Sequence, residues 1–166
     1  EDPIKLMFNK TYVLVGSRNS GKTSMALSMV LLPNQLGAQS DVIVVFCNGG
    51  SMSQWKWLED RRLPHRVYPE LKEDVIDAMF ETNAKRIAKK KECVRYLVIF
   101  DDSLDRRSVH NNAVNRIFQH GRIHMICPLV LQQSLRLEKA PPDVFVHLFV
   151  SFFSQSNSDF HVFLSF

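Results

Sequence analysis

The chain contains one run of residues whose types and order suit phosphate binding. Residues 16–23 read Gly-Ser-Arg-Asn-Ser-Gly-Lys-Thr, which fits the pattern G-x-x-x-x-G-K-S/T without a mismatch. The two glycines would let the backbone turn tightly and bring its N–H groups within reach of phosphate oxygens. Lys22 would reach the β and γ phosphates of a nucleotide, and the Thr23 hydroxyl would coordinate Mg²⁺. The alternative is an ordinary glycine turn capped by Ser20.

The segments on either side of this loop are those that a phosphate site requires. Thr11–Val15 is a compact apolar strand that ends at Gly16, and apolar residues recur at helical spacing from Gly21 until Pro33. The start of a helix adds the positive end of its dipole to such a loop. We therefore expect the nucleotide to be bound by the loop and the first helical turn, namely Gly16, Ser17, Arg18, Asn19, Ser20, Gly21, Lys22, Thr23 and Ser24.

A pair of carboxylates follows another apolar run. Tyr96–Phe100 is wholly apolar and is followed directly by Asp101 and Asp102. In an open α/β sheet the ligand lies at the carboxyl ends of the strands, where such residues would meet the phosphate loop. We expect Asp101 to bind Mg²⁺, directly or through its water shell, and Asp102 to orient or deprotonate the attacking water. The alternative is a helix cap followed by a loop charge.

Short apolar runs alternate with longer periodic segments along the chain. Strands are expected at Thr11–Val15, Asp41–Cys47, Tyr96–Phe100, Met125–Leu131 and Val144–Phe153, and helices at Gly21–Leu32, Ser51–Glu59, Leu71–Lys91 and Asn112–His120. This order predicts an α/β three-layer sandwich with a mostly parallel five-stranded sheet. One full strand separates the loop helix from the acidic strand, which resembles the RecA-like division of P-loop NTPases, with strand order 5-1-4-3-2.

Three local features are left open by the pattern. Pro128 interrupts a predicted strand, which requires either a bulge or a strand that begins at Leu129. The segment Phe152–Phe166 is unusually apolar, and its residues Phe160, Val162, Phe163, Leu164 and Phe166 suggest a further strand or a subunit contact. Trp55 and Trp57 are two positions apart and cannot share one face, so at least one is expected in the core.

Length and composition are those of one globular domain. The chain has 166 residues, of which 45% are hydrophobic and 23% charged, so we expect a single P-loop ATPase domain over 1–166. It starts at Glu1 without an initiator Met, which leaves open that the domain is a fragment of a longer protein. No apolar run approaches the roughly 18 residues of a membrane span. The cysteines form no C-x-x-C pair, and we expect reduced thiols in an intracellular protein.

Basic residues are concentrated in two stretches. The net charge is +4, and one stretch holds Lys85, Arg86, Lys89, Lys90, Lys91 and Arg95, the other Arg61, Arg62, His65 and Arg66. Either stretch could contact a polyanion without reading its sequence. The alternative is a solvated helix face with its flanking loop.

From Tyr96 onward the chain resembles the FtsK–HerA division of P-loop ATPases, and within it the genome-packaging ATPases of poxviruses, giant viruses and virophages. Three features carry the resemblance: Asp101-Asp102 after an apolar strand, His120-Gly-Arg122 before the next strand, and Gln132-Gln133-Ser134 at the end of that strand. The resemblance implies that Arg122 is an arginine finger and that Gln133 is the sensor amide, with Gln132 as the other candidate. A surface arginine and a polar residue closing a strand are the alternatives.

The resemblance also implies a function. It implies Mg²⁺-dependent ATP hydrolysis that pumps double-stranded DNA into a capsid, by a ring that is expected to be a hexamer. The expected catalytic residues are Lys22, Asp102, Gln133 and Arg122, and the expected Mg²⁺ ligands are Thr23 and Asp101. ATP and Mg²⁺ are the cofactors, and DNA, further copies of the chain and capsid proteins are the partners, with no membrane. For a viral protein the location would be host cytoplasm, a viral factory or the virion.

Two other functions stay open. A P-loop kinase of a small acceptor would use a lid rich in arginine, for which the chain offers Arg106, Arg107, Arg116 and Arg122. A degenerate ATPase could serve as a nucleotide-gated capsid scaffold. No N-K-x-D guanine motif is present, so a GTPase is not expected. The histidines lack metal-ligand spacing with the cysteines, and no zinc site is expected.

Overall fold

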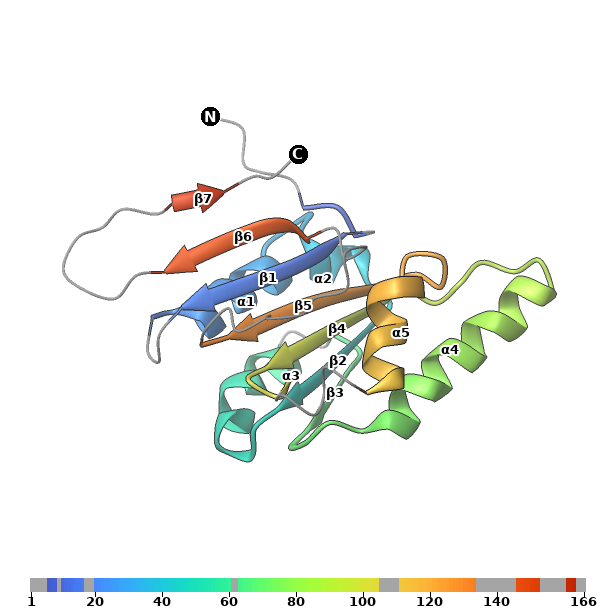
Figure 1. Cartoon of the computed structure of the whole chain (residues 1–166), viewed down its shortest axis with the longest axis horizontal. Helices are drawn as coiled ribbons and strands as arrows, with labels where there is room; N and C mark the ends of the chain where they lie inside the picture. Colours follow the sequence, from blue (N-terminus) through green and yellow to red (C-terminus); the bar gives the residue numbers. More distant parts are fainter. Residues whose placement is uncertain are drawn as a thin grey trace.

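A seven-stranded sheet forms the centre of the computed structural model, with strands in the order β3-β2-β4-β5-β1-β6-β7 (Figure 1). The structure describes residues 6–8, 10–16, 20–60, 63–104, 111–133, 146–152 and 161–163. The strands are β1 Thr11–Gly16, β2 Val42–Cys47, β3 His65–Tyr68, β4 Tyr96–Asp101, β5 Ile126–Gln132, β6 Val146–Phe152 and β7 His161–Phe163. The helices are α1 Lys22–Leu31, α2 Leu36–Gln39, the 3₁₀ helix η1 Gly49–Lys56, α3 Trp57–Asp60, α4 Glu73–Ala88 and α5 Asn112–His120.

The five predicted strands are present in the predicted order. Strands β6, β1, β5, β4 and β2 are neighbours in that sequence, and each pair is parallel. Strand β7 extends the sheet antiparallel to β6, so a further strand does form within the apolar tail. The α/β fold class and the 5-1-4-3-2 order are therefore confirmed.

Strand β3 was not predicted. It pairs with β2 at the edge of the sheet and contains His65 and Arg66 of the second basic stretch, so these two residues lie on a strand and not on a helix face or its flanking loop. None of the four residues of β3 is fully buried, and the strand is too short to show a clear alternation of apolar and polar residues. The conformation of β3 is decided by its pairing with β2, a contact that no local pattern of residues predicts.

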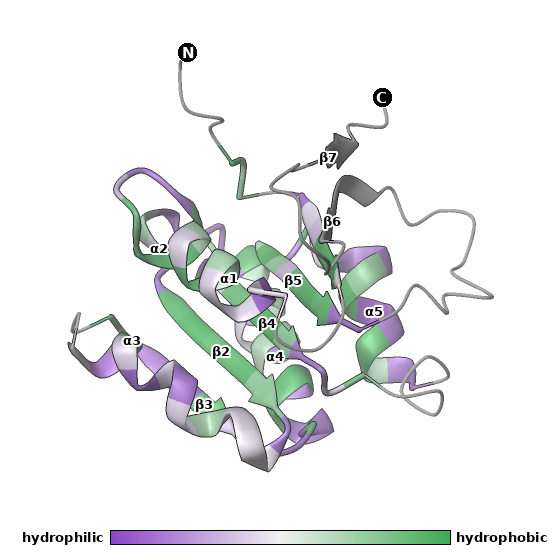
Figure 2. Cartoon of the chain, turned by 90° about the vertical axis from the view of Figure 1, so that its left-hand side faces the viewer, coloured by the Kyte–Doolittle hydropathy of each residue, from purple (hydrophilic) through white to green (hydrophobic). Residues whose placement is uncertain are grey.

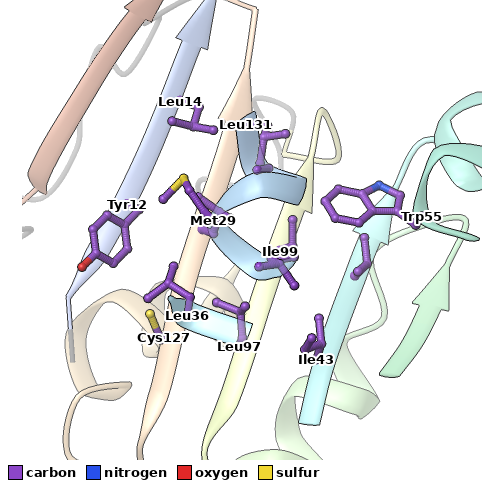
Figure 3. Packing of buried hydrophobic residues seen from close by; sticks show 14 of the residues in the cluster. Tyr12, Leu14, Met29, Leu36, Ile43, Trp55, Leu97, Ile99, Cys127 and Leu131 are labelled. Carbon is purple, nitrogen blue, oxygen red and sulfur yellow. The ribbon is translucent and has the colours of Figure 1, made fainter. Parts of the chain in front are cut away.

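Helices cover both faces of the sheet. On one face α1, α2, η1 and α3 pack over Leu97, Ile99 and their strand neighbours, as Figure 3 shows. On the other face α4 and α5 pack over Val98 and Phe100. Because successive strand residues point to opposite faces and both faces are covered, the strands read as continuous apolar runs. Figure 2 shows this in β2, which is hydrophobic along its length, whereas α5 alternates between hydrophobic and hydrophilic residues.

The helices differ from expectation in detail. Residues 51–59, predicted as one short helix, form most of η1 and the start of α3, and the four-residue helix α2 was not predicted. The predicted helix Leu71–Lys91 is shorter in the structure, as α4, and its apolar residues Ile76 and Phe80 are buried, whereas Ile87 near its end is 43% exposed. Trp55 is 1% exposed and Trp57 is 58% exposed, so one tryptophan lies in the core as predicted.

Pro128 lies inside β5 without a bulge on the side of β4. The pairing of β4 with β5 runs on through Val98 and Pro128, whereas the pairing of β1 with β5 begins at Leu129. Strand β5 begins at Ile126 and pairs with β4 through Pro128 without a break in register, so neither a bulge nor a strand start at Leu129 is observed. Only the pairing with β1 begins at Leu129.

The three cysteines are unpaired. Burial raises the pKa of the Cys47 thiol to about 11 and that of Cys127 to about 12, so both are held as neutral thiols.

Within the parts of the chain that the structure describes, none of the helices has both the length and the apolar character that a membrane span requires.

The side chain of Asn83 ties α4 to the amino ends of two strands. Asn83 is 0% exposed, and its amide nitrogen donates to the carbonyl oxygens of Val94 at 2.8 Å and His124 at 2.6 Å. Its amide oxygen accepts from the N–H of Val94 at 2.8 Å. The segments that lead into β4 and β5 are thereby held side by side.

We predict that Asn83→Ala lowers the free energy of unfolding by about 3 kcal/mol, because buried backbone groups at Val94 and His124 lose their partner. Urea unfolding would measure the loss. Asn112→Ala, at an exposed position in α5, is the control and should change stability by less than about 0.5 kcal/mol. Equal effects of the two substitutions would contradict the prediction.

Candidate functional site

A pocket of about 840 Å³ opens at the carboxyl ends of β1, β2, β4 and β5. The parallel strands β1, β4 and β5 end on the same side of the molecule (Figure 1). The lining residues come from the segments that follow these strands: Ser20, Gly21, Lys22, Thr23, Ser24 and Leu27; Asn48, Gly50, Ser51, Gln54 and Trp57; Asp101 and Asp102; and Gln133. The pocket therefore contains residues of both motifs that the sequence singled out.

A glycine in a left-handed conformation starts helix α1. Gly21 has φ +86°, and its carbonyl accepts the helical hydrogen bond from the N–H of Met25 at 2.9 Å. A Cβ at this position would meet nothing within 4 Å, so backbone strain rather than space favours glycine. The amino end of α1, with its positive dipole, lies at the pocket. The predicted loop residues Ser17, Arg18 and Asn19 lie outside the described residues.

Lys22 is held against the start of the loop. Its side chain is buried, with 6% exposure, and its Nζ donates to the carbonyl oxygen of Gly16 at 2.8 Å. Thr23, half-buried, and Ser24, exposed, follow it in the first turn of α1, and all three residues line the pocket. The ammonium group is thus positioned where the loop, the helix start and the end of β1 meet.

Asp101 is a buried carboxylate at the end of β4. It is 2% exposed, and its Oδ2 accepts a hydrogen bond from the indole Nε1–H of Trp55 at 3.0 Å. Burial raises the pKa of Asp101, and the charge of Asp102 adds to this, whereas the Trp55 hydrogen bond and the charge of Lys22 act in the opposite direction. A cation placed against this carboxylate would offset the cost of its burial.

Asp102 and Gln133 contact each other at the pocket wall. Asp102 is exposed and has φ +49°, a left-handed conformation that Asp tolerates better than most residues. Its backbone N–H donates to the Leu131 carbonyl at 3.0 Å, and its Oδ2 accepts from the amide of Gln133 at 3.3 Å. Gln133 lines the pocket and Gln132 does not, so the structure brings Gln133 to the acidic pair.

The oxygen atoms at the pocket fit a magnesium ion that is shared with phosphate. The Thr23 hydroxyl and the Asp101 carboxylate are hard oxygen donors, which Mg²⁺ prefers. Within the described ranges, no group of three or more His, Cys, Asp or Glu side chains is placed to hold a metal ion. An ion at this position would therefore complete its shell with water and phosphate oxygens, as Mg²⁺ commonly does in phosphate-transfer sites.

Arg122 lies at the amino ends of the strands, opposite the carboxyl ends where the pocket opens. It is exposed in the turn between α5 and β5, before β5 begins at Ile126. In Figure 1 this turn, drawn in orange, lies away from the ends of the strands where the pocket opens. A seven-residue strand spans about 20 Å, so Arg122 is not brought to the pocket of its own chain.

The sequence did not point to the wall formed by η1 and α3. Five lining residues follow β2, and the partner of Asp101, Trp55, comes from the same segment. The available signal was that this segment leaves the carboxyl end of an apolar strand, which in a parallel sheet meets the same edge as the phosphate loop. Which of its side chains turn toward the pocket depends on how η1 packs.

A parallel sheet with a glycine turn after β1 and carboxylates after β4 is an α/β fold similar to that of a P-loop NTPase. Among solved structures, the chain is similar to the genome packaging NTPase B204 from Sulfolobus turreted icosahedral virus 2. With AMP bound to that protein, the TM-score is 0.57 at 18% identity, over 91% of this chain and 78% of that chain. With ATP-gammaS, the TM-score is 0.54 at 16% identity, over the same shares of the two chains.

B204, the DNA-packaging ATPase from Sulfolobus Turreted Icosahedral Virus, is similar with a TM-score of 0.53 at 16% identity, over 89% of this chain and 77% of that chain. The expected resemblance to viral genome-packaging ATPases is thus confirmed at the level of the fold. No family model matches the sequence. No curated protein matches it either.

We predict that Asp101→Asn raises the free energy of unfolding at pH 7 in metal-free buffer. A folded-state pKa above that of the unfolded chain means that the fold favours the protonated carboxyl, so the parent protein loses stability as the pH rises through that pKa. The neutral amide avoids this loss, and the difference should shrink as the pH is lowered to roughly 4, near the ordinary pKa of Asp.

Urea unfolding at several pH values in EDTA would measure this difference. Asp74→Asn, at an exposed position of α4, is the control and should shift stability by less than about 0.5 kcal/mol. A variant that is less stable than the parent at pH 7, by more than at pH 4, would contradict the expected sign.

Proposed function

We propose that this chain is a P-loop ATPase domain over 1–166 that hydrolyses Mg-ATP to translocate DNA, in the manner of a viral genome-packaging motor. One observation carries the proposal: five residues expected to act on a nucleotide, from three segments of the chain, all line one pocket. They are Lys22, Thr23, Asp101, Asp102 and Gln133. The similarity of fold to B204 supports the same conclusion.

In this proposal the loop and α1 bind the triphosphate. The ammonium group of Lys22 exchanges the Gly16 carbonyl for the β and γ phosphates, while the start of α1 directs its free N–H groups at them. Thr23 and Asp101 hold Mg²⁺. When bound, the ion neutralises charge on the phosphate oxygens.

Asp102 and Gln133 act on water in the same proposal. The oxygen of a water molecule attacks the γ phosphorus while the bond to the β-phosphate oxygen breaks, and Asp102 orients the water or takes its proton. Gln133 carries both a donor and an acceptor, so its amide can bond to phosphate and to the water. Its hydrogen bond to Asp102 keeps the two groups within reach of one site.

Adenine rather than guanine is the proposed base. The chain has no N-K-x-D motif, and the similar structures of B204 are in complex with ATP-gammaS, AMPPCP and AMP. Both observations favour ATP.

We predict that Lys22→Ala abolishes ATP binding or turnover, because the loop loses the charge that meets the β and γ phosphates. Asp102→Asn should still bind ATP but hydrolyse it at least about a hundredfold more slowly, since general-base or water-orienting groups contribute roughly 10²–10⁴-fold. Calorimetry would measure binding, and phosphate release would measure turnover.

Lys56→Ala is the matched control, because Lys56 is an exposed lysine of η1 that does not line the pocket. Normal hydrolysis by Asp102→Asn would move the role in water activation to another group. ATP binding without any turnover by the parent protein, with or without DNA, would instead support a nucleotide-gated scaffold.

Arg122 is proposed to act on a neighbouring subunit. It lies at the amino ends of the strands, while the pocket lies at their carboxyl ends. A head-to-tail contact, which generates rings, brings two such different surfaces together. We therefore propose a ring, a hexamer by resemblance, in which the Arg122 guanidinium enters the next pocket and speeds hydrolysis by a factor of about 10³–10⁵.

A mixing experiment tests the shared site. Lys22→Ala protein retains Arg122, and Arg122→Ala protein retains the phosphate loop, so a mixture should recover part of the DNA-stimulated ATPase activity that neither variant shows alone. Arg116→Ala, which removes an arginine paired with Asp77 at 3.2 Å, is the control partner and should not need rescue. Activity that is independent of protein concentration, with no recovery on mixing, would rule out a trans finger.

The end of α4 is the proposed DNA-binding surface. Lys85, Lys89, Lys90 and Lys91 are exposed there, on the segment that Asn83 holds beside the turn containing Arg122. Three basic residues of this stretch have local partners: Lys85 pairs with Glu81 at 3.6 Å, Arg86 donates to the Glu92 carbonyl, and Arg95 pairs with Asp41 at 2.8 Å. Arg61 and Arg62, of the other basic stretch, lie outside the described residues, and Arg66 is exposed on β3.

We predict that replacing Lys89, Lys90 and Lys91 together by Ala weakens binding to double-stranded DNA equally for unrelated sequences. The slope of log affinity against log salt should become shallower by about 1–3, because up to three phosphate contacts are lost. Fluorescence anisotropy over a range of salt would measure both quantities. Lys72→Ala, which removes a lysine paired with Glu70, is the control. An unchanged slope would place the DNA contacts elsewhere.

The described arginines do not favour a kinase lid. Arg116 pairs with Asp77 and lies over the Phe80 ring at 4.0 Å, and Arg122 lies at the opposite edge of the sheet from the pocket. Arg106 and Arg107 lie outside the described residues.

As a packaging motor the protein would work beside capsid proteins, inside an infected cell.

A further inference from the structure

One hydrogen bond joins the end of β4 to the helix η1. The indole Nε1–H of Trp55 donates to Oδ2 of Asp101 at 3.0 Å, although the two residues are 46 positions apart in the sequence. Trp55 is 1% exposed and Asp101 is 2% exposed, so water has little access to either side chain. Without this hydrogen bond, the rotation of the buried Asp101 carboxylate would be less restricted.

The chemistry of the indole suits a group that orients a metal ligand. The indole nitrogen donates a hydrogen bond and has no lone pair to accept one, so Trp55 can hold a carboxylate but cannot replace it as a metal ligand. With Oδ2 accepting one hydrogen bond from Trp55, Oδ1 and the remaining lone pair of Oδ2 are left for an ion in the pocket. Carboxylates that bind metals are commonly held by such outer partners, whose loss typically reduces metal affinity by 10–100-fold.

The packing of Trp55 makes it a rigid partner. Its ring lies in the hydrophobic core on the same face of the sheet as Ile43 and Ile99, as Figure 3 shows. Leu58, one turn further along, is 0% exposed in the same cluster. The same segment provides Gln54 and Trp57 to the pocket wall, so Trp55 connects this wall to the carboxylate.

We propose that Trp55 is a positioning residue: its hydrogen bond orients Asp101 for Mg²⁺ and couples occupation of the metal site to η1 and the adjoining pocket wall. This inference rests on the proposed function, because it concerns the metal ion of the same nucleotide site. It assigns a role to a residue that does not line the pocket.

The first test removes the donor and keeps an aromatic ring. Trp55→Phe should bind a fluorescent ATP analogue in EDTA as the parent protein does, whereas the Mg²⁺ concentration needed for the ternary complex should rise by about 10–100-fold. Leu58→Ala is the matched control, since it loosens the same core cluster and should lower stability without changing the Mg²⁺ requirement. A Mg²⁺ requirement within twofold of the parent in Trp55→Phe overturns the proposal.

The second test leaves Trp55 in place and so does not depend on the folding of a core variant. The chain has two tryptophans, and in Trp57→Phe protein all indole emission comes from Trp55. With nucleotide present, its emission should change and saturate as Mg²⁺ is added, and the change should be absent when Asp101→Asn is introduced into the same protein. Constant emission while Mg²⁺ binds, as measured by calorimetry, overturns the coupling.

The experiments distinguish a failure of the proposed nucleotide site from a failure of the role given to Trp55. If the parent protein binds no nucleotide with or without Mg²⁺, the proposed function fails and this inference falls with it. If the parent binds Mg-nucleotide and Trp55→Phe does so with the same Mg²⁺ requirement, only the role of Trp55 is overturned.

Discussion

The covering of a parallel sheet on both faces is the constraint on which this structure depends. Strands β1, β2, β4 and β5 are buried along almost their whole length, and helices occupy both sides of the sheet. Polar side chains placed within such strands would lose their hydration, so the chemistry moves to the strand ends. Because the strands are parallel, one edge of the sheet collects Lys22, Asp101 and Gln133 from positions that are far apart in the sequence.

The same burial removes two ionisable side chains at the site from water. Lys22 and Asp101, both charged in their ordinary states, are 6% and 2% exposed. The fold compensates with the Gly16 carbonyl for the ammonium group and with the Trp55 indole for the carboxylate. Even with the Trp55 hydrogen bond in place, burial still raises the pKa of Asp101. Groups that are incompletely solvated in the free protein gain most from a ligand that brings opposite charge, which is a general property of binding sites.

The carboxyl ends and the amino ends of the parallel strands form different surfaces. The carboxyl ends hold the pocket, whereas the amino ends hold Arg122 and the lysines at the end of α4. Asn83 fixes the second arrangement, because its three hydrogen bonds hold the segments before β4 and β5 together.

The sequence by itself determined the elements whose signals are local. The glycine loop, the apolar strands and the long helix α4 could be predicted because backbone conformation and burial leave patterns in neighbouring residues. The strand order followed from the resemblance to RecA-like P-loop NTPases. Tertiary structure decided the rest. Strand β3 depends on pairing with β2, and the contact of Trp55 with Asp101 spans 46 positions. The separation of Arg122 from the pocket follows from the length and direction of β5. Such relations arise from packing between remote segments, for which no local pattern of residues exists.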